Sequence, residues 1–251
     1  SELVVSNCLQ CHAGHFNGEL IVGLGKALLP IKKAQRPALV RLPQAQQFIV
    51  KLEATPAQPL IKLASRLLAL TAVRPSCAQM ARYEEFHDLD SEEPYWRIPA
   101  AKMKLARAEK EQEVFDFVVP LARQAVDVIA AARQLSGHTP WLFPSRRDMR
   151  KPMSENALVY LYQRAGFTGK HVPHGWRASF STIMNERAAL LDNPADRQVI
   201  DLMLAHQQSG VEPIYNRALY MPRRRALAQE WADLLLKDMP PPTALLHLPR
   251  R

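Results

Sequence analysis

The chain has 251 residues, 47% of them hydrophobic, which is enough for one large core or two small ones. Its 33 Lys and Arg outweigh 24 Asp and Glu, and the net charge of +9 favours a polyanionic partner, nucleic acid first. The sequence has no apolar run long enough for a transmembrane helix and no visible signal peptide, and its three cysteines do not suggest a disulfide framework. We therefore expect a cytoplasmic protein with no membrane association.

Residues 1–40 are expected to be irregular, as a linker or the remnant of a preceding domain, because glycines recur there and a basic stretch follows at 32–37. Within this segment Cys8, Cys11 and His12 form a C-x-x-C-H pattern. The pattern is compatible with covalent haem attachment or, with His15, with half of a zinc site, but we interpret it as a chance match. Haem attachment would require export, for which no signal is visible.

Hydrophobic periodicity and turn residues predict a mainly helical domain over residues 41–238. Two strands are predicted at 95–99 and 114–120, joined by a charged hairpin arm with a basic tip. A proline run from Met239 ends the last helix, so residues 239–251 are expected to form a tail. The predicted helices span 43–53, 56–70, 75–85, 121–135, 154–165, 175–186, 194–206 and 223–237.

A set of polar residues near the C-terminus carries the chemistry: His174, Arg177, His206 and Tyr215. His174 and Arg177 lie three apart and so share a face at the start of a helix. An arginine fork suits the non-bridging oxygens of a phosphodiester, and histidine can bind the same oxygens or shuttle a proton. A tyrosine beside such groups can act as a nucleophile toward phosphorus, so we expect phosphoryl transfer to Tyr215.

The sequence around these residues resembles the catalytic domain of tyrosine recombinases, over roughly residues 55–238. The segments that carry the resemblance are HVPHGWRASFSTIMNE, LAHQQ and YNRALYMPRRRALAQEWADLL, and it is most similar to prophage and genomic-island integrases of the satellite-phage type. Upstream, LLALTAVRP matches the segment of the family's first catalytic arginine, which implies Arg74. YWRIPAAKMK matches the strand and turn of the catalytic lysine, which implies Lys104, although Lys102 lies two positions away.

The resemblance implies a mainly α fold with a small three-stranded antiparallel β-sheet (α+β). It implies site-specific recombination of double-stranded DNA, for integration or excision of a mobile element, through a 3′-phosphotyrosyl link. Arg74, His174, Arg177 and His206 would stabilise the transition state and Lys104 would protonate the leaving 5′-oxygen, with no metal and no cofactor. The partners implied are DNA attachment sites and a homotetramer on DNA, with a monomer away from it.

Several features leave alternatives open. The family usually has a Gly-Glu pair after Arg-Pro, whereas this chain has Ser76 and Cys77, so a supporting carboxylate is missing beside Arg74. The N-terminal DNA-binding domains of the family are not visible, so the sequence is interpreted as a catalytic-domain fragment or remnant. Tyr220 competes with Tyr215 as the nucleophile. A catalytically silent DNA-binding remnant, a type IB topoisomerase and a haem protein are the competing functions.

Overall fold

The computed structural model describes residues 13–16, 19–22, 40–205 and 220–247. The chain divides into two compact units, Ser1–Ala38 and Leu39–Arg251. In the first unit, β1 (Ala13–Phe16) pairs antiparallel with β2 (Glu19–Val22). Irregular structure was predicted throughout this segment, and the hairpin differs from that prediction. The strand ELIV has only four residues and is flanked by glycines, which usually indicate a loop.

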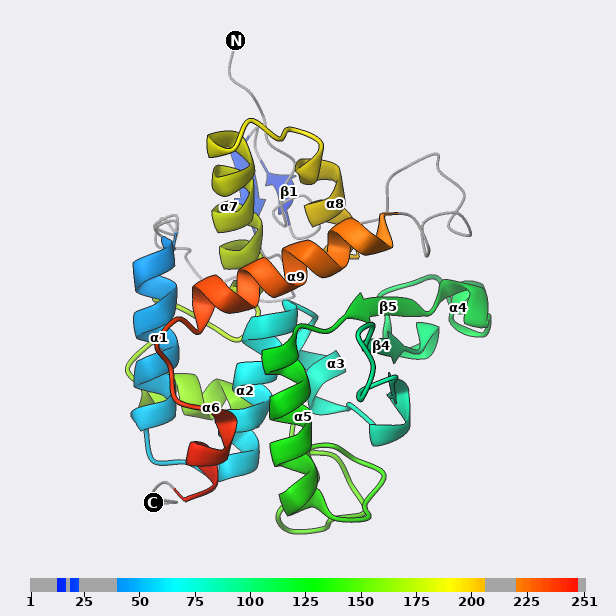
Figure 1. Ribbon diagram of the computed structural model, residues 1–251, viewed down its shortest axis with the longest axis vertical. Coiled ribbons are helices and arrows are strands. Elements are labelled where there is room, and N and C mark those ends of the chain that lie inside the picture. Colours follow the sequence, from blue (N-terminus) through cyan, green and yellow to red (C-terminus); the bar gives the residue numbers. More distant parts are fainter. Residues whose placement is uncertain (1–12, 17–18, 23–39, 206–219, 248–251) are drawn as a thin grey trace. The chain divides into compact units, whose positions relative to one another are not determined.

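The second unit is mainly helical, as predicted, and most of its helices begin and end within a few residues of the predicted bounds (Figure 1). The helices are α1 (Leu42–Ala54), α2 (Pro59–Thr71), α3 (Pro75–Gln79), α4 (Arg107–Lys110), α5 (Arg123–Ser136), α6 (Ala157–Arg164), α7 (Gly175–Leu190), α8 (Asp196–Met203) and α9 (Met221–Leu235). Short 3₁₀ turns lie at η2 (Tyr83–Glu85), η3 (Ala100–Lys102), η4 (Glu113–Phe115) and η5 (Pro242–Leu246). None of the helices in these ranges is long and apolar enough to cross a membrane.

Helix α2 forms the centre of this unit and contacts α1, α5, α6, α7 and α9 (Figure 1). Its leucines at 63, 67 and 68 are fully buried. Lys62 and Arg66 are also buried: the Arg66 guanidinium pairs with the Glu53 carboxylate at 2.5 Å, and Lys62 Nζ donates to the Glu53 carbonyl at 2.7 Å. Polar partners from α1 therefore make two charged positions compatible with the most buried helix.

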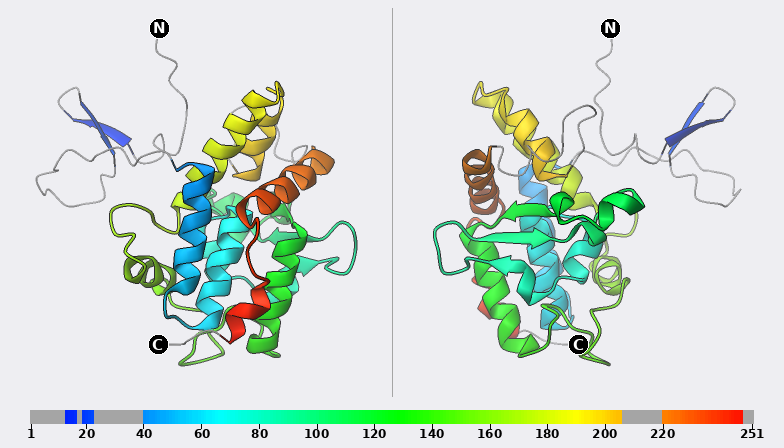
Figure 2. Two further views of the ribbon diagram at one scale, coloured as in Figure 1. Left: turned by 60° about the vertical axis from the view of Figure 1, so that its left-hand side comes forward. Right: turned by 90° about the vertical axis from the view of Figure 1, so that its right-hand side faces the viewer.

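The three-stranded antiparallel sheet has the order β3 (Phe86–His87), β4 (Tyr95–Ile98) and β5 (Phe117–Pro120), and it lies along one side of the helices (Figure 2). A helix was predicted over 75–85, but α3 ends at Gln79 and the chain turns into β3. Phe86 stacks on Trp96 with ring centroids 4.9 Å apart, and this burial outweighs local helix propensity. The expected basic tip of the arm contains the short helix α4, which also carries Glu109.

Three consecutive arginines, at positions 223–225, lie at the start of α9. In the structure each has a partner within the chain. Arg223 pairs with Asp196 of α8, Arg225 pairs with Glu93, and the buried Arg224 donates to the Val118 carbonyl of β5. These contacts attach α9 to α8 and to the sheet.

Residues 239–251 were separated from the domain as a tail. Their described part, up to His247, packs on the second unit: Leu245 is 1% exposed, η5 contacts α2 and α5, and the Pro240 carbonyl accepts a hydrogen bond from Arg66 Nη1 at 2.9 Å. The segment thus adds apolar surface and one buried hydrogen bond to the core.

Candidate active site

Arg177 is the residue that connects the predicted site. It lies in the first turn of α7, is 3% exposed, and donates from Nη1 to the Ala72 carbonyl at 3.0 Å and from Nη2 to the Leu204 carbonyl at 2.5 Å. Ala72 and Leu204 are the C-cap residues of α2 and α8, whose last carbonyls have no partner within their own helices. A guanidinium is well suited to this position because the C-terminal ends of helices favour positive charge.

Both helix ends that Arg177 binds contain a left-handed alanine. Ala72 has φ 49° and Ala205, directly after Leu204, has φ 51°. Such a conformation is unfavourable for a residue with a Cβ atom and needs support from its surroundings. The two supported turns lead directly to candidate catalytic positions: Arg74 comes two residues after Ala72, and His206 comes next after Ala205.

Arg74 is partly exposed and forms the N-cap position of α3, where its carbonyl accepts the Cys77 N–H at 2.9 Å. His174 is exposed and precedes the first residue of α7. Lys104 is exposed on the arm, between η3 and α4. His206 and Tyr215 lie outside the described residues, as do Cys8, Cys11 and His12, so the structure places four of the six predicted site residues.

The Cys77 thiol lies near the positive charges of Arg74, Lys102 and Arg177. It is 1% exposed, and burial raises its pKa, while the nearby positive charges of Arg74, Lys102 and Arg177 oppose that rise. The group at this position is therefore a neutral thiol rather than the carboxylate common in the family. Arg74, Lys102 and Arg177 are thus all close enough to the Cys77 thiol to influence its pKa.

The N-terminus of α7 rests on a cluster of aromatic rings that includes His171. His171 is 5% exposed, lies tilted against Phe48, stacks on Tyr162 and meets Trp176 edge-on. Trp176 is fully buried, and its Nε1 donates to the Tyr162 hydroxyl. Burial raises the pKa of Tyr162 to about 12, which makes this phenol an even poorer nucleophile than an exposed one.

Gly175 is needed for the contact between α7 and this cluster. A Cβ atom at position 175 would lie 2.8 Å from two atoms of the His171 ring, well inside van der Waals contact. The ring is held on three sides and cannot move aside easily. The Gly175 position therefore fixes where α7 begins, and with it His174 and Arg177.

We expect Gly175→Ala to lower the free energy of unfolding by about 1–3 kcal/mol, because the helix start must shift away from the ring. A displacement of up to 1 Å at His174 and Arg177 should lower the rate of any reaction at this site by about 10–100-fold. Urea unfolding of the single and double variants with His171→Ala tests the cause. The cost of Gly175→Ala should shrink once the ring is gone, and an equal cost in both backgrounds would contradict the contact.

Burial lowers the pKa of His171 from 6.5 to about 4. Between these values the unfolded chain binds a proton that the folded chain does not, so stability falls as the pH falls. We expect the His171 contribution to the free energy of unfolding to drop by about 2 kcal/mol between pH 7 and pH 5. Urea titrations at pH 7 and pH 5 measure this loss of stability. The wild type and His138→Phe, a control that removes an exposed histidine, should both show it. In His171→Phe the loss between the two pH values should be smaller by about 2 kcal/mol.

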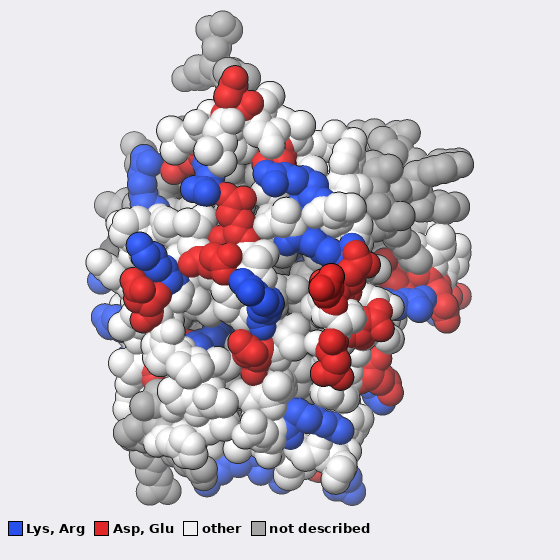
Figure 3. Space-filling model, viewed as in Figure 1, with Lys and Arg blue, Asp and Glu red and all other residues white. Residues whose placement is uncertain are grey.

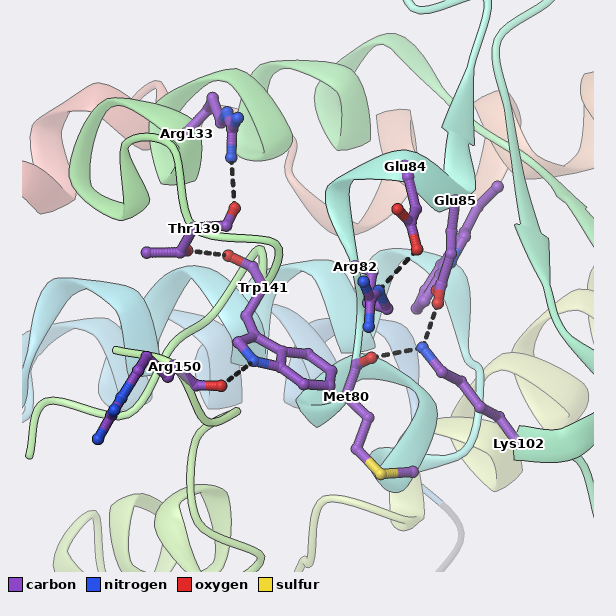
Figure 4. Close-up of polar contacts among 10 residues, drawn as sticks. Met80, Arg82, Glu84, Glu85, Lys102, Arg133, Thr139, Trp141 and Arg150 are labelled. Atoms are coloured by element: carbon purple, nitrogen blue, oxygen red, sulfur yellow. Dashed lines mark hydrogen bonds and ion pairs between the residues drawn. The ribbon is translucent and has the colours of Figure 1, made fainter. Parts of the chain in front are cut away.

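The sequence analysis named Lys102 only as a competitor of Lys104 and did not predict its ion pair with the buried Glu85. Glu85 is 5% exposed, its Oε2 accepts the Trp96 Nε1–H at 3.0 Å, and its other oxygen pairs with Lys102 Nζ (Figure 4). Lys102 Nζ also donates to the Met80 carbonyl at 2.5 Å. The acidic side chain lies in a run of charged residues, and nothing in that run distinguishes the buried Glu85 from the exposed Glu84.

Comparison with known proteins places this arrangement in a family. Residues 40–221 match the phage integrase family. The chain is 34% identical over 206 residues to prophage integrase IntZ of Escherichia coli K12, covering 81% of this chain and 47% of IntZ. It is 34% identical over 232 residues to prophage integrase IntA of the same strain (90% and 51%), and 31% identical over 221 residues to the integrase of Enterobacteria phage P4 (83% and 47%).

The chain thus spans about half the length of the curated relatives it matches. No solved structure matches it significantly. The predicted mainly α fold with a three-stranded antiparallel sheet is confirmed and fits a tyrosine recombinase catalytic domain. From the extent of the family match and the identity to these integrases, the chain belongs to the phage integrase family.

Proposed function

We propose that the protein is a tyrosine-type site-specific recombinase that cuts and rejoins DNA through a 3′-phosphotyrosyl intermediate, in the integration or excision of a mobile element. One observation carries the proposal. The buried fork of Arg177 binds the ends of α2 and α8, the two helices that lead to Arg74 and His206. This contact supports a single phosphate site assembled from segments more than 100 residues apart.

In the proposed reaction the Tyr215 oxygen attacks phosphorus, a P–O bond to tyrosine forms, and the bond from phosphorus to the 5′-oxygen breaks. Arg74, Arg177, His174 and His206 stabilise the charge that builds on the non-bridging oxygens. Position 174 suits this role because the N-terminus of α7 favours an anion. The bond energy is retained in the phosphotyrosyl link, so the DNA can be rejoined by reversal without ATP.

Lys104 is the proposed donor of the proton that the leaving 5′-oxygen needs. The competing residue, Lys102, has a side chain only 14% exposed, and its ammonium is already bound by Glu85 and the Met80 carbonyl. Lys104 is exposed and lies two residues further along the arm. An accessible ammonium on an arm can approach a scissile bond, whereas a buried ion pair would first have to break.

We further propose double-stranded attachment sites as the substrate and a homotetramer on DNA as the working assembly. On the face seen in Figure 3, the described Lys and Arg side chains alternate with Asp and Glu, so the net charge is not gathered there. The loop 145–151 is a better candidate for phosphate contact. Four of its seven residues are basic and exposed (Arg146, Arg147, Arg150 and Lys151), and Trp141 fixes the loop by donating to the Arg150 carbonyl at 2.8 Å.

The test uses nicked DNA duplexes from a pool with a randomised central sequence. Cleavage releases a short strand that diffuses away, so the covalent protein–DNA adduct cannot be rejoined and is trapped. Wild-type protein should form an adduct that survives denaturation, without metal or nucleotide. Labelled second duplexes then distinguish recombination from topoisomerase-like rejoining, since only recombination joins the two labels. Absence of any adduct from all duplexes would contradict the proposal and favour a silent DNA-binding remnant.

A further inference from the structure

A buried charged network connects the helix that follows Arg74 with the arm that carries Lys104. Its members are Met80, Glu85, Trp96 and Lys102, and Figure 4 shows the contacts of Lys102 with Met80 and Glu85. Met80 is the C-cap of α3, Glu85 ends η2, Trp96 lies on β4, and Lys102 ends η3. Four elements of the chain therefore meet at one lysine ammonium and one carboxylate.

The arm is attached to α3 by backbone as well as by side chain. Lys102 Nζ donates to the Met80 carbonyl, and in return the Cys77 thiol donates a weak hydrogen bond to the Lys102 carbonyl at 3.8 Å. Cys77 and Met80 flank the last turn of the helix that Arg74 begins. The start of the arm is thereby held at a fixed place relative to Arg74, two residues before Lys104.

A surface ion pair would not achieve this. Exposed pairs contribute little and exchange freely with water, whereas here the side chains of Lys102 and Glu85 are only 14% and 4% exposed. Removing one partner from such a pair leaves a charge without compensation in a poorly hydrated place. The Lys102–Glu85 pair therefore holds the start of the arm in one position. That position determines which places the Lys104 ammonium, two residues further on, can reach.

We propose that Glu85 and Lys102 are positioning residues for proton donation by Lys104. They act through the backbone of the arm, not by touching DNA. This inference rests on the proposed function, because it concerns the step in which the 5′-oxygen leaves.

The test uses two DNA substrates, one normal and one with sulfur in place of the 5′-oxygen at the scissile bond. A thiolate leaves without a proton donor because its pKa is far below that of an alcohol. Loss or misplacement of the proton donor should therefore slow only the normal substrate. The ratio of the two cleavage rates, measured on one protein sample, does not depend on how much of that sample is folded.

We expect Lys104→Ala to lower the normal rate by about 100-fold or more and to cleave the sulfur substrate at nearly the wild-type rate. Glu85→Gln and Lys102→Met should show the same pattern at about 10–100-fold. The matched control is Glu84→Gln, the same change one residue away at a carboxylate that is 69% exposed and pairs with Arg82 (Figure 4). It should leave both rates unchanged, and Lys102→Arg should retain most of the normal rate.

The outcomes separate the two claims. If the sulfur substrate fails to rescue Lys104→Ala, the proposed role of Lys104 is wrong whatever the other variants do. If Lys104→Ala is rescued but Glu85→Gln slows both substrates equally, the network supports the fold alone and the positioning role is overturned. A Glu85→Gln variant that cleaves the normal substrate at the wild-type rate would overturn it as well.

Discussion

Arg177→Lys is expected to lower the rate of covalent adduct formation by about 10³-fold. A lysine has one point charge and cannot bind two carbonyls in different directions while also facing a phosphate. The carbonyls of Ala72 and Leu204 would lose the partner that holds them 3.0 and 2.5 Å from the guanidinium. Because at least one of these buried carbonyls would remain without a donor, the free energy of unfolding should fall by about 2–4 kcal/mol.

Arg187→Lys is the matched control. Arg187 lies on the same helix, is half-exposed, and pairs with Glu230 of α9. The same chemical change there should cost less than about 1 kcal/mol and leave the cleavage rate within a few-fold of wild type. Urea unfolding and single-turnover trapping measure both quantities. Equal effects at the two positions would show that Arg177 has no special role in joining the helix ends.

The second large effect is expected at Tyr215. Tyr215→Phe removes only the attacking oxygen and should lower adduct formation by about 10⁶-fold, below detection, while DNA affinity stays within a few-fold. Tyr220→Phe is the control, since Tyr220 is half-exposed, directly precedes α9 and competes with Tyr215 in sequence. Adduct from Tyr215→Phe together with loss of adduct from Tyr220→Phe would reverse the assignment.

The sequence was most informative where hydrophobic periodicity and similarity to the family motifs agreed. Helices α2, α5, α7 and α9 were predicted within a few residues, because α2 is buried along nearly its whole length and the other three bury apolar residues on one face. The family pattern predicted which polar residues share a site, since it compares whole segments rather than single positions. That grouping, and the role of each residue in it, remains a prediction.

The features that sequence reasoning missed depend on contacts between distant segments. Glu85 and Lys102 are 17 residues apart, and Arg177 reaches an alanine 105 positions away. No local pattern distinguishes a buried charge with such partners from a solvated one. The two-residue strand β3 is similarly invisible, because its existence depends on Phe86 stacking on Trp96.

The central claim is that one phosphate site places Tyr215 opposite the guanidinium of Arg177. The most direct test is to digest the trapped adduct with a protease and identify the DNA-linked peptide by mass spectrometry. We predict a single modified residue, Tyr215, joined through phosphate to a 3′-end, with a free 5′-hydroxyl on the released strand. Attachment at another residue, or to a 5′-end, would contradict the account.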